Sequence, residues 1–198
     1  MLTTEWLISF LAFAISMSIS PGPNNLMVMA SSSNFGLVRT MPHLLGIWIG
    51  FFGLVVFTSL GVGSIVQSVP GVYIVMKVAG ALYLFYLGVR IAMINSTIQS
   101  KDARPFTLLQ AATFQLINPK GWLMALGTAS TFAPKDTAPL TYALVTGAAF
   151  TLVNIVSNGV WAVLGRGIAQ ILSTPSRVRV FNLSIASLLF ISVYFVLA

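Results

Sequence analysis

Two short stretches interrupt apolar segments with residues that end helices and can bind a ligand. The first is Pro21-Gly22-Pro23-Asn24-Asn25, and the second, about half a chain later, is Asn118-Pro119-Lys120. Proline lacks an N–H and clashes with the preceding turn, and glycine is costly inside a helix, so neither stretch continues an α-helix. In hydrocarbon, a broken backbone is tolerated only where protein or a water-filled cavity satisfies its polar groups. We therefore expect both breaks to face the interior of a bundle, beside a binding site.

Each break has the residue order that starts a new helix. Asn118 suits the N-cap and Pro119 the first helical position, and Gly22-Pro23 can act in the same way. A helix N-terminus offers unpaired N–H groups and a partial positive charge, which favour an anion. Lys120 follows the second break, and Lys77 lies in another apolar segment. These features predict a cationic pocket, rich in donors, that suits a carboxylate.

Both lysines have an alternative interpretation, in which the ammonium group snorkels to the membrane interface. Lys77 lies a turn or two from the start of its predicted helix and fits either interpretation. Lys120 lies near the middle of an apolar segment, where a charge is expensive and usually functional. The site is therefore the favoured interpretation for Lys120.

Several neutral polar residues also lie in apolar segments. Asn24, Asn25, Asn154 and Asn158 can bind a substrate amine or hydroxyl, or they can join helices. Asn24 favours the site, whereas the last two, spaced i and i+4, fit both roles. His43, a residue type that titrates near neutrality, is either a proton-coupling group or, more commonly for such a residue, interfacial.

The composition defines the class of protein. Of 198 residues, 57% are hydrophobic and 7% are charged, against about 25% charged in a soluble domain. We predict an all-α membrane protein with one domain, 1–198, and six spans of roughly 20 residues each. The predicted spans are 5–33, 42–66, 72–94, 106–132, 140–164 and 178–198, with the breaks inside the first and the fourth.

The charge distribution predicts an orientation. The net charge is +7, but the ten Lys and Arg residues are spread singly, which argues against nucleic-acid binding. The connections after spans one, three and five carry Arg39, Arg90, Lys101, Arg104, Arg166, Arg177 and Arg179. The opposite side has Lys135 beside Asp136, and Glu5. The positive-inside rule then places the odd connections in the cytoplasm and both termini outside.

The two halves, about 1–100 and 101–198, resemble each other. Ile19-Ser20-Pro21 matches Ile117-Asn118-Pro119. Gly46, Gly50 and Gly53, whose spacing on one helix face predicts close helix packing, match Gly147, Thr151 and Asn154. Three spans per half require the second copy to be inverted in the membrane. A 3+3 inverted repeat with paired broken helices is typical of transporters that hold substrate near the midplane.

Other classes of function lack their residues. All three acidic residues lie in or near connections, which argues against an intramembrane aspartyl protease, a carboxylate metal transporter and a carboxylate proton relay. The chain has no cysteine, no His-Glu-x-x-His, no phosphate loop and no sensibly spaced Ser/His/Asp set. We predict no enzyme, no metal site and no cofactor.

The motifs resemble the LysE/RhtB superfamily of amino-acid exporters over essentially the whole chain. They are Ser20-Pro21-Gly22-Pro23-Asn24-Asn25, the Gly46/Gly50 helix, Lys77-x-x-Gly80-Ala81-x-Tyr83-Leu84-x-Tyr86-Leu87-Gly88 and Phe114-Gln115-x-x-Asn118-Pro119-Lys120. Ser130-Thr131-Phe132 and Asn158-Gly159-x-Trp161-Ala162-x-x-Gly165 are more similar to the cysteine/O-acetylserine exporter branch. The resemblance implies six spans and efflux of amino acids across the bacterial inner membrane, driven by the proton-motive force. The family motif residues on this chain are Pro21, Gly22, Pro23, Lys77, Asn118, Pro119 and Lys120.

We therefore predict a secondary transporter that exports small neutral amino acids or derivatives, either cysteine/O-acetylserine-like or homoserine/threonine-like. The breaks and Lys120 would bind the carboxylate, and Asn24, Asn154 and Asn158 the amine end. An exchanger or uptake carrier of the same fold, and a non-transporting helical scaffold, are the alternatives. The predicted partners are the amino-acid substrate and the lipid bilayer, and a homo-oligomer is left open.

Overall fold

The computed structural model describes residues 3–94, 104–134 and 137–197, and within these ranges every regular element is helical. This confirms the predicted all-α class. The elements are α1 (Thr4–Ile19), α2 (Pro23–Phe35), α3 (Leu37–Phe57), a π-helical turn η1 (Thr58–Val62), α4 (Gly63–Ser68), α5 (Pro70–Ala92), α6 (Leu108–Phe114), α7 (Pro119–Thr131), α8 (Pro139–Ile171) and α9 (Pro175–Leu197).

Both predicted helix breaks are present. Helix α1 ends at Ile19, and α2 begins at Pro23 with Gly22 as its N-cap, at a bend of 51°. Helix α7 begins at Pro119 with Asn118 as its N-cap. Proline at the first helical position and an N-cap before it therefore start a helix at both places.

Within the described residues, four helical stretches are long and apolar enough to cross a membrane, and the α1–α2 pair makes a fifth if it counts as one span. The four are Leu37–Val62, Ile74–Ala92, Pro139–Ile171 and Pro175–Leu197. The predicted fourth span is divided between α6, with 7 residues, and α7, with 13. The protein is thus a multi-pass helical membrane protein, while the six-span count and the 3+3 repeat stay predictions.

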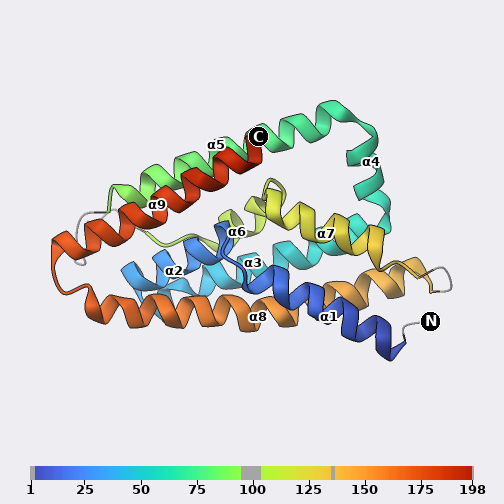
Figure 1. Cartoon of the computed structure of the whole chain (residues 1–198), viewed down its shortest axis with the longest axis horizontal. Helices are drawn as coiled ribbons and strands as arrows, with labels where there is room; N and C mark the ends of the chain where they lie inside the picture. Colours follow the sequence, from blue (N-terminus) through green and yellow to red (C-terminus); the bar gives the residue numbers. More distant parts are fainter. Residues whose placement is uncertain (1–2, 95–103, 135–136, 198) are drawn as a thin grey trace.

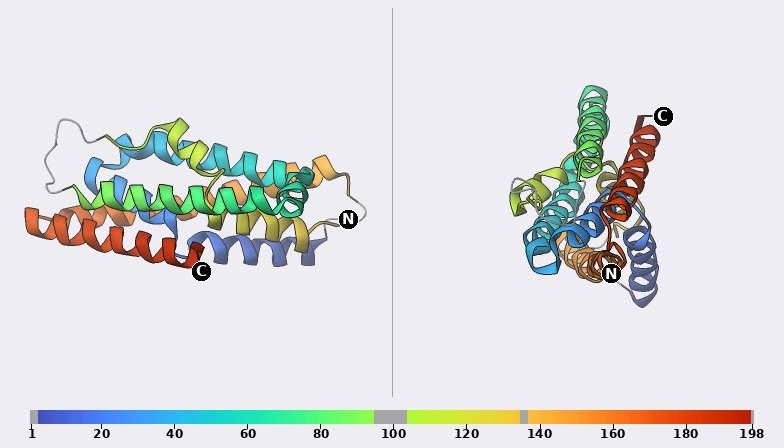
Figure 2. Two further views of the ribbon diagram at one scale, coloured as in Figure 1. Left: turned by 90° about the horizontal axis from the view of Figure 1, so that it is seen from above. Right: turned by 90° about the vertical axis from the view of Figure 1, so that its left-hand side faces the viewer.

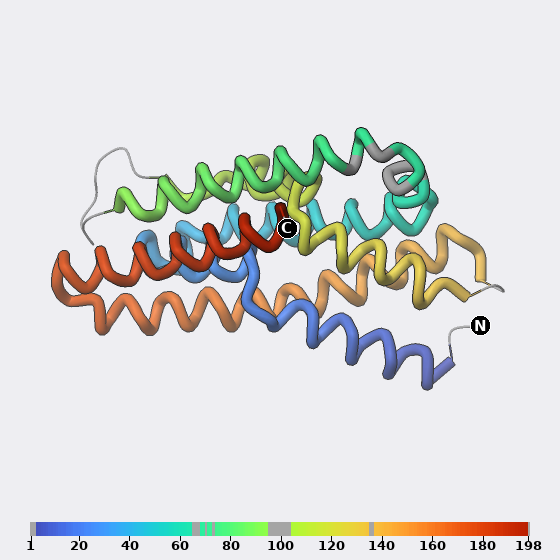
Figure 3. Tube along the Cα trace, turned by 45° about the horizontal axis from the view of Figure 1, so that its top comes forward, coloured from blue at the N-terminus to red at the C-terminus, as the bar shows by residue number. Residues whose placement is uncertain are grey.

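The helices run back and forth along the long axis of the molecule (Figures 1 and 2). Helices α5 and α9 lie side by side, α8 packs along α1, α2 and α3, and α3 packs against α6. The connections from α2 to α3 and from α8 to α9 lie at one end, which we call the basic end because it carries Arg39 and Arg177. The N-terminus, the end of α7 and the start of α8 lie at the opposite end (Figure 3).

Close helix contacts occur at two of the three glycines predicted to pack. A Cβ on Gly50 would lie 2.6 Å from the carbonyl oxygen of Ala112 in α6, and Gly46 meets the same helix at Leu108. Small residues therefore let α3 and α6 approach backbone to backbone, as in many membrane helix pairs. Gly53 faces only Phe57 of its own helix, so the prediction is wrong at that position.

Candidate binding site at the helix breaks

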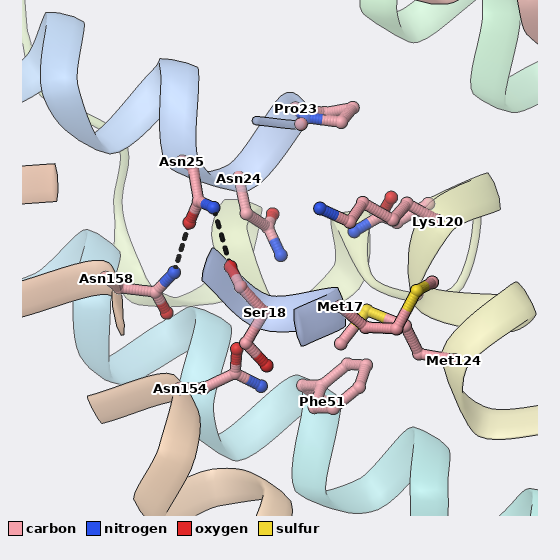
Figure 4. Close-up of a pocket in the computed structure, with 13 residues that line it drawn as sticks. Met17, Ser18, Pro23, Asn24, Asn25, Phe51, Lys120, Met124, Asn154 and Asn158 are labelled. Carbon is pink, nitrogen blue, oxygen red and sulfur yellow. Dashed lines mark hydrogen bonds between the residues drawn. The ribbon is translucent and has the colours of Figure 1, made fainter. Parts of the chain in front are cut away.

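Asn25 satisfies the backbone at the end of α1. Its Nδ2 donates to the carbonyl oxygens of Ser18 at 2.8 Å and of Ser20 at 3.0 Å. Its Oδ1 accepts from Nδ2 of Asn158 in α8 at 2.7 Å (Figure 4). Asn25 is buried. It therefore stabilises the broken backbone and fixes the position of Asn158.

Helix α8 supplies two further donors to the end of α1. Ser157 Oγ donates to the Ser18 carbonyl at 2.8 Å, and Trp161 Nε1 donates to the Ile19 carbonyl at 3.2 Å. Ser157 and Trp161 are four residues apart, so both lie on the face of α8 that meets the break. Sequence reasoning placed only asparagines of this helix at the site. The signal available in the sequence was the i, i+4 spacing of Ser157 and Trp161, which places both on one face of this helix.

Lys120 joins the two breaks. Its Nζ donates to the carbonyl oxygen of Ser20 at 2.7 Å, to Ser20 Oγ at 2.8 Å and to the Pro21 carbonyl at 3.4 Å. These atoms are about 100 residues away in the chain. The breaks, far apart in sequence, are thus in direct contact, with a cation between them.

Gly22 makes room for the lysine stem. Its φ and ψ of −175° and 175° are extended, a conformation that any residue adopts. A Cβ at this position would instead lie 2.7 Å from Lys120 Cδ and 3.0 Å from Lys120 Nζ. The close approach of Lys120, and not the backbone conformation, therefore explains the glycine.

A cluster of amides, in which Gln115 and Asn118 are buried and Asn24 is partly buried, forms a second link between the breaks. Asn24 and Gln115 exchange two hydrogen bonds, of 3.0 and 3.1 Å, and Asn118 Nδ2 donates to Gln115 Oε1 at 3.0 Å. Gln115 is fully buried and also donates to the Ala111 carbonyl at 3.0 Å. Gln115 was absent from the predicted site, although it stands three residues before Asn118 in the same motif.

The N-termini of the two half-helices remain open to an anion. Gly22 has no side chain to cap α2, and Asn118 makes no side-chain cap bond to α7, since its Oδ1 has no partner among the described residues. The N–H groups of the first turns, the two helix dipoles and the Lys120 ammonium all favour negative charge at this point. No acidic residue is among the described residues that line the adjoining cavities.

A small cavity with both polar and apolar lining residues lies against both breaks. Its volume of about 20 Å³ suffices for about one water molecule. Three buried atoms at its wall have no hydrogen-bond partner within the described part of the chain: Ser18 Oγ, Asn118 Oδ1 and Asn158 Oδ1. Of the predicted site residues, this cavity brings together Gly22, Pro23, Asn24, Asn25, Asn118, Lys120, Asn154 and Asn158.

A larger cavity, of about 410 Å³, lies on the other side of the first break, between α7 and the α5–α9 pair. It contains the remaining predicted residues, Pro21, Lys77 and Pro119, and it shares Lys120 with the small cavity. Lys77 is partly buried there. Lys120 thus lies between the two cavities, whereas Lys77 reaches only the larger one.

His43 lies apart from these cavities. Its side chain is fully buried in α3 and packs on Phe106, with ring centroids 5.0 Å apart. Neither ring nitrogen has a partner among the described residues. His43 is therefore packed inside the helix bundle, and its two interpretations, proton coupling and an interfacial position, stay predictions.

Several helices long and apolar enough to cross a membrane, packed around cavities that share Lys120, define a multi-pass helical membrane protein. The chain belongs to the LysE family, whose LysE type translocator model matches residues 15–198. This is a family of transporters rather than of enzymes. No solved structure matches the chain.

Two kinds of relative illustrate the family. The chain is 24% identical over 165 residues to a cysteine/O-acetylserine efflux protein of Escherichia coli K12, covering 83% of this chain and 84% of that protein. It is 24% identical over 192 residues to a homoserine/homoserine lactone efflux protein of Salmonella typhimurium LT2, covering 94% and 93%. Amino-acid efflux relatives therefore match nearly the whole chain.

Proposed function

We propose that this protein is a secondary transporter that exports small neutral amino acids or their derivatives across the bacterial inner membrane. The observation that carries the proposal is the contact of Lys120 with Ser20, which places a cation between two half-helix N-termini. The matched relatives are named for efflux of cysteine, O-acetylserine and homoserine. All three compounds are small and carry an α-amino group.

In this proposal the carboxylate binds where the donors converge. Lys120 Nζ exchanges the Ser20 oxygens for the carboxylate, and the open first turns of α2 and α7 donate N–H groups. The amine end lies toward Asn154 and Asn158, which Figure 4 places across the cavity from Lys120. Asn158 Oδ1 is a buried acceptor without a partner, which suits an ammonium group. Asn24 contributes through its amide pair with Gln115.

Access to the site alternates, in our proposal, by rocking of the helices around it. The larger cavity separates α7 from the α5–α9 pair on one side. Toward the basic end the same pair is tied to α2, because Asn182 of α9 bonds both Asn34 at 3.1 Å and the Ile94 carbonyl at 2.9 Å. In one end state of such a rocking motion, the basic end is closed and a cavity is open beside the breaks. The arrangement described above has both features.

The helix contacts support, as a proposal, the inverted 3+3 arrangement. If the two halves are exchanged, α5 takes the place of α9 and α3 that of α8, so the α5–α9 and α3–α8 contacts are preserved. The packing of α8 on α1 and α2, the first broken helix, then corresponds to the packing of α3 on α6 and α7, the second. We also propose that the basic end faces the cytoplasm and both termini lie outside. Coupling to the proton-motive force then uses a carrier other than a carboxylate, because no described acidic residue lines either cavity.

Flux into inverted membrane vesicles tests the proposal. Labelled cysteine, O-acetylserine, homoserine, threonine and lysine are supplied under an imposed proton gradient. We expect uptake of the small neutral compounds and its loss in Lys120→Met, whereas Lys77→Met, which removes the lysine of the larger cavity alone, retains uptake. Near-normal flux in a folded Lys120→Met protein would remove Lys120 from the site.

The same assay distinguishes the alternatives. Flux that requires an amino acid on the opposite side of the membrane indicates an exchanger, and flux only into right-side-out vesicles indicates uptake. No flux for any amino acid favours a non-transporting scaffold. Either of the last two results would overturn the export proposal.

A further inference from the structure

We infer that Met17, Phe51 and Met124 determine which substrate side chains this transporter accepts, and that they restrict it to small, uncharged ones. The inference rests on the proposed function, because it assigns a wall of the same small cavity. It adds the residues that set the size limit.

These three side chains form the apolar wall of the cavity. They come from three elements, α1, α3 and α7, and meet on one side of it (Figure 4). Apart from Pro23 and two glycines, the other residues that line the cavity are polar and include Lys120 and Asn158. The polar groups suit the carboxylate and ammonium that all α-amino acids share. The apolar wall is therefore what remains to contact the side chain, by which amino acids differ.

The wall has one rigid member. Phe51 is 2% exposed and packs edge-on against Phe150, with ring centroids 5.4 Å apart and an interplanar angle of 77°. Phe150 is fully buried and is held in turn by Phe10 at 5.4 Å. Since close-packed aromatic rings have no free volume to enter, Phe51 cannot retreat from a larger substrate.

The other two members are adaptable. Met17 and Met124 are unbranched thioethers, the side chains that adjust most easily to a guest. The cavity of about 20 Å³ can therefore enlarge by rearrangement of the two methionines, while Phe51 limits how far. A side chain of the size of that of cysteine, threonine or homoserine fits these conditions, whereas a larger branched one such as that of leucine, or an aromatic one, does not. A charged side chain would be buried against apolar atoms without a partner, which is costly.

Met124→Ala tests the inference directly. The measurement is the ratio of initial leucine flux to homoserine flux in inverted vesicles. One methylene in an apolar pocket typically discriminates about 10- to 200-fold, so we expect this variant to raise the ratio about 10-fold or more. The matched control is Met27→Ala, a methionine of α2 that is 2% exposed but lies in the core shared with α5 and α9. It should leave the ratio unchanged.

Two further variants keep the test decisive if Met124→Ala does not fold. Met17→Ala and Phe51→Leu enlarge the same wall from α1 and α3, and each should also raise the leucine ratio. An unchanged ratio in variants that fold and still transport homoserine would overturn the inference and leave the proposed function intact. Absence of any amino-acid flux in the wild-type protein would overturn the proposed function itself.

Discussion

Replacing Gly22 by alanine should impair transport, and displacement of the Lys120 side chain should be the sole cause. The extended backbone at Gly22 accepts alanine without strain. The new Cβ, however, would lie 2.7 Å from Lys120 Cδ, whereas carbon atoms in contact are separated by about 3.5–4.0 Å. The lysine stem must therefore move by about 1 Å, and the 2.7 and 2.8 Å bonds of its ammonium group to Ser20 are lost.

The size of the effect follows from those bonds. A hydrogen bond that involves a charged group contributes about 1.5–3 kcal/mol. If the substrate carboxylate depends on the same ammonium position, loss of one such bond lowers flux about 10- to 100-fold, at about 1.4 kcal/mol per tenfold. The assay is initial uptake of homoserine into inverted vesicles, with the amount of folded protein measured by detergent chromatography.

A double-mutant cycle separates this mechanism from general damage. In a Lys120→Ala background there is no stem to displace, so Gly22→Ala should lower the free energy of unfolding in detergent less than it does in the wild-type protein. Gly167→Ala is the matched control, because a Cβ at this glycine of α8 has no neighbour within 4 Å. Wild-type flux in a folded Gly22→Ala protein, or equal losses of unfolding free energy in both backgrounds, would refute the reasoning.

Two further predictions concern stability and orientation. Asn25→Ala should lower the free energy of unfolding by only about 1–2 kcal/mol, because the Ser18 and Ser20 carbonyls keep Ser157 and Lys120 as donors. Thermal unfolding in detergent measures this loss. A much larger loss would contradict this account of the break. Because the chain has no cysteine, Ser173→Cys and Thr137→Cys each introduce a single thiol. We expect an impermeant maleimide to label Cys at position 173 only in inverted vesicles and Cys at position 137 only in intact cells. The reverse pattern would contradict the proposed orientation.

The positions of the breaks could be predicted because their causes are local. Pro23 and Pro119 cannot continue the preceding helix, and Gly22 and Asn118 precede them as N-caps. The partners of the polar groups could not be predicted in the same way. Asn25 and Asn158 bond each other across 133 residues, and only the tertiary fold brings them together.

The fourth predicted span shows a different limit. A hydropathy pattern counts apolar residues across 106–132, but helix length depends on where hydrogen bonding starts and stops. Thr107 and Gln110 form a capping box that begins α6, and the turn after Phe114 ends it after 7 residues. The apolar character of the segment was therefore readable in the sequence, while the length of its helices was not. The π-helical turn after α3, where Gly61 adopts φ 109°, likewise could not be predicted from the hydropathy pattern.

The backbone groups on the two sides of the first break differ in their hydrogen-bond partners, and this difference explains why the pocket suits an anion. The carbonyls that α1 leaves open at Ser18, Ile19 and Ser20 all receive donors from side chains of α2, α7 or α8. The N-termini of α2 and α7 receive no side-chain acceptor. Since buried backbone donors require partners, a fold that satisfies its acceptors and leaves its donors open creates a demand for negative charge at that point. Lys120 increases this demand, and in the proposed function a substrate carboxylate is the group that meets it.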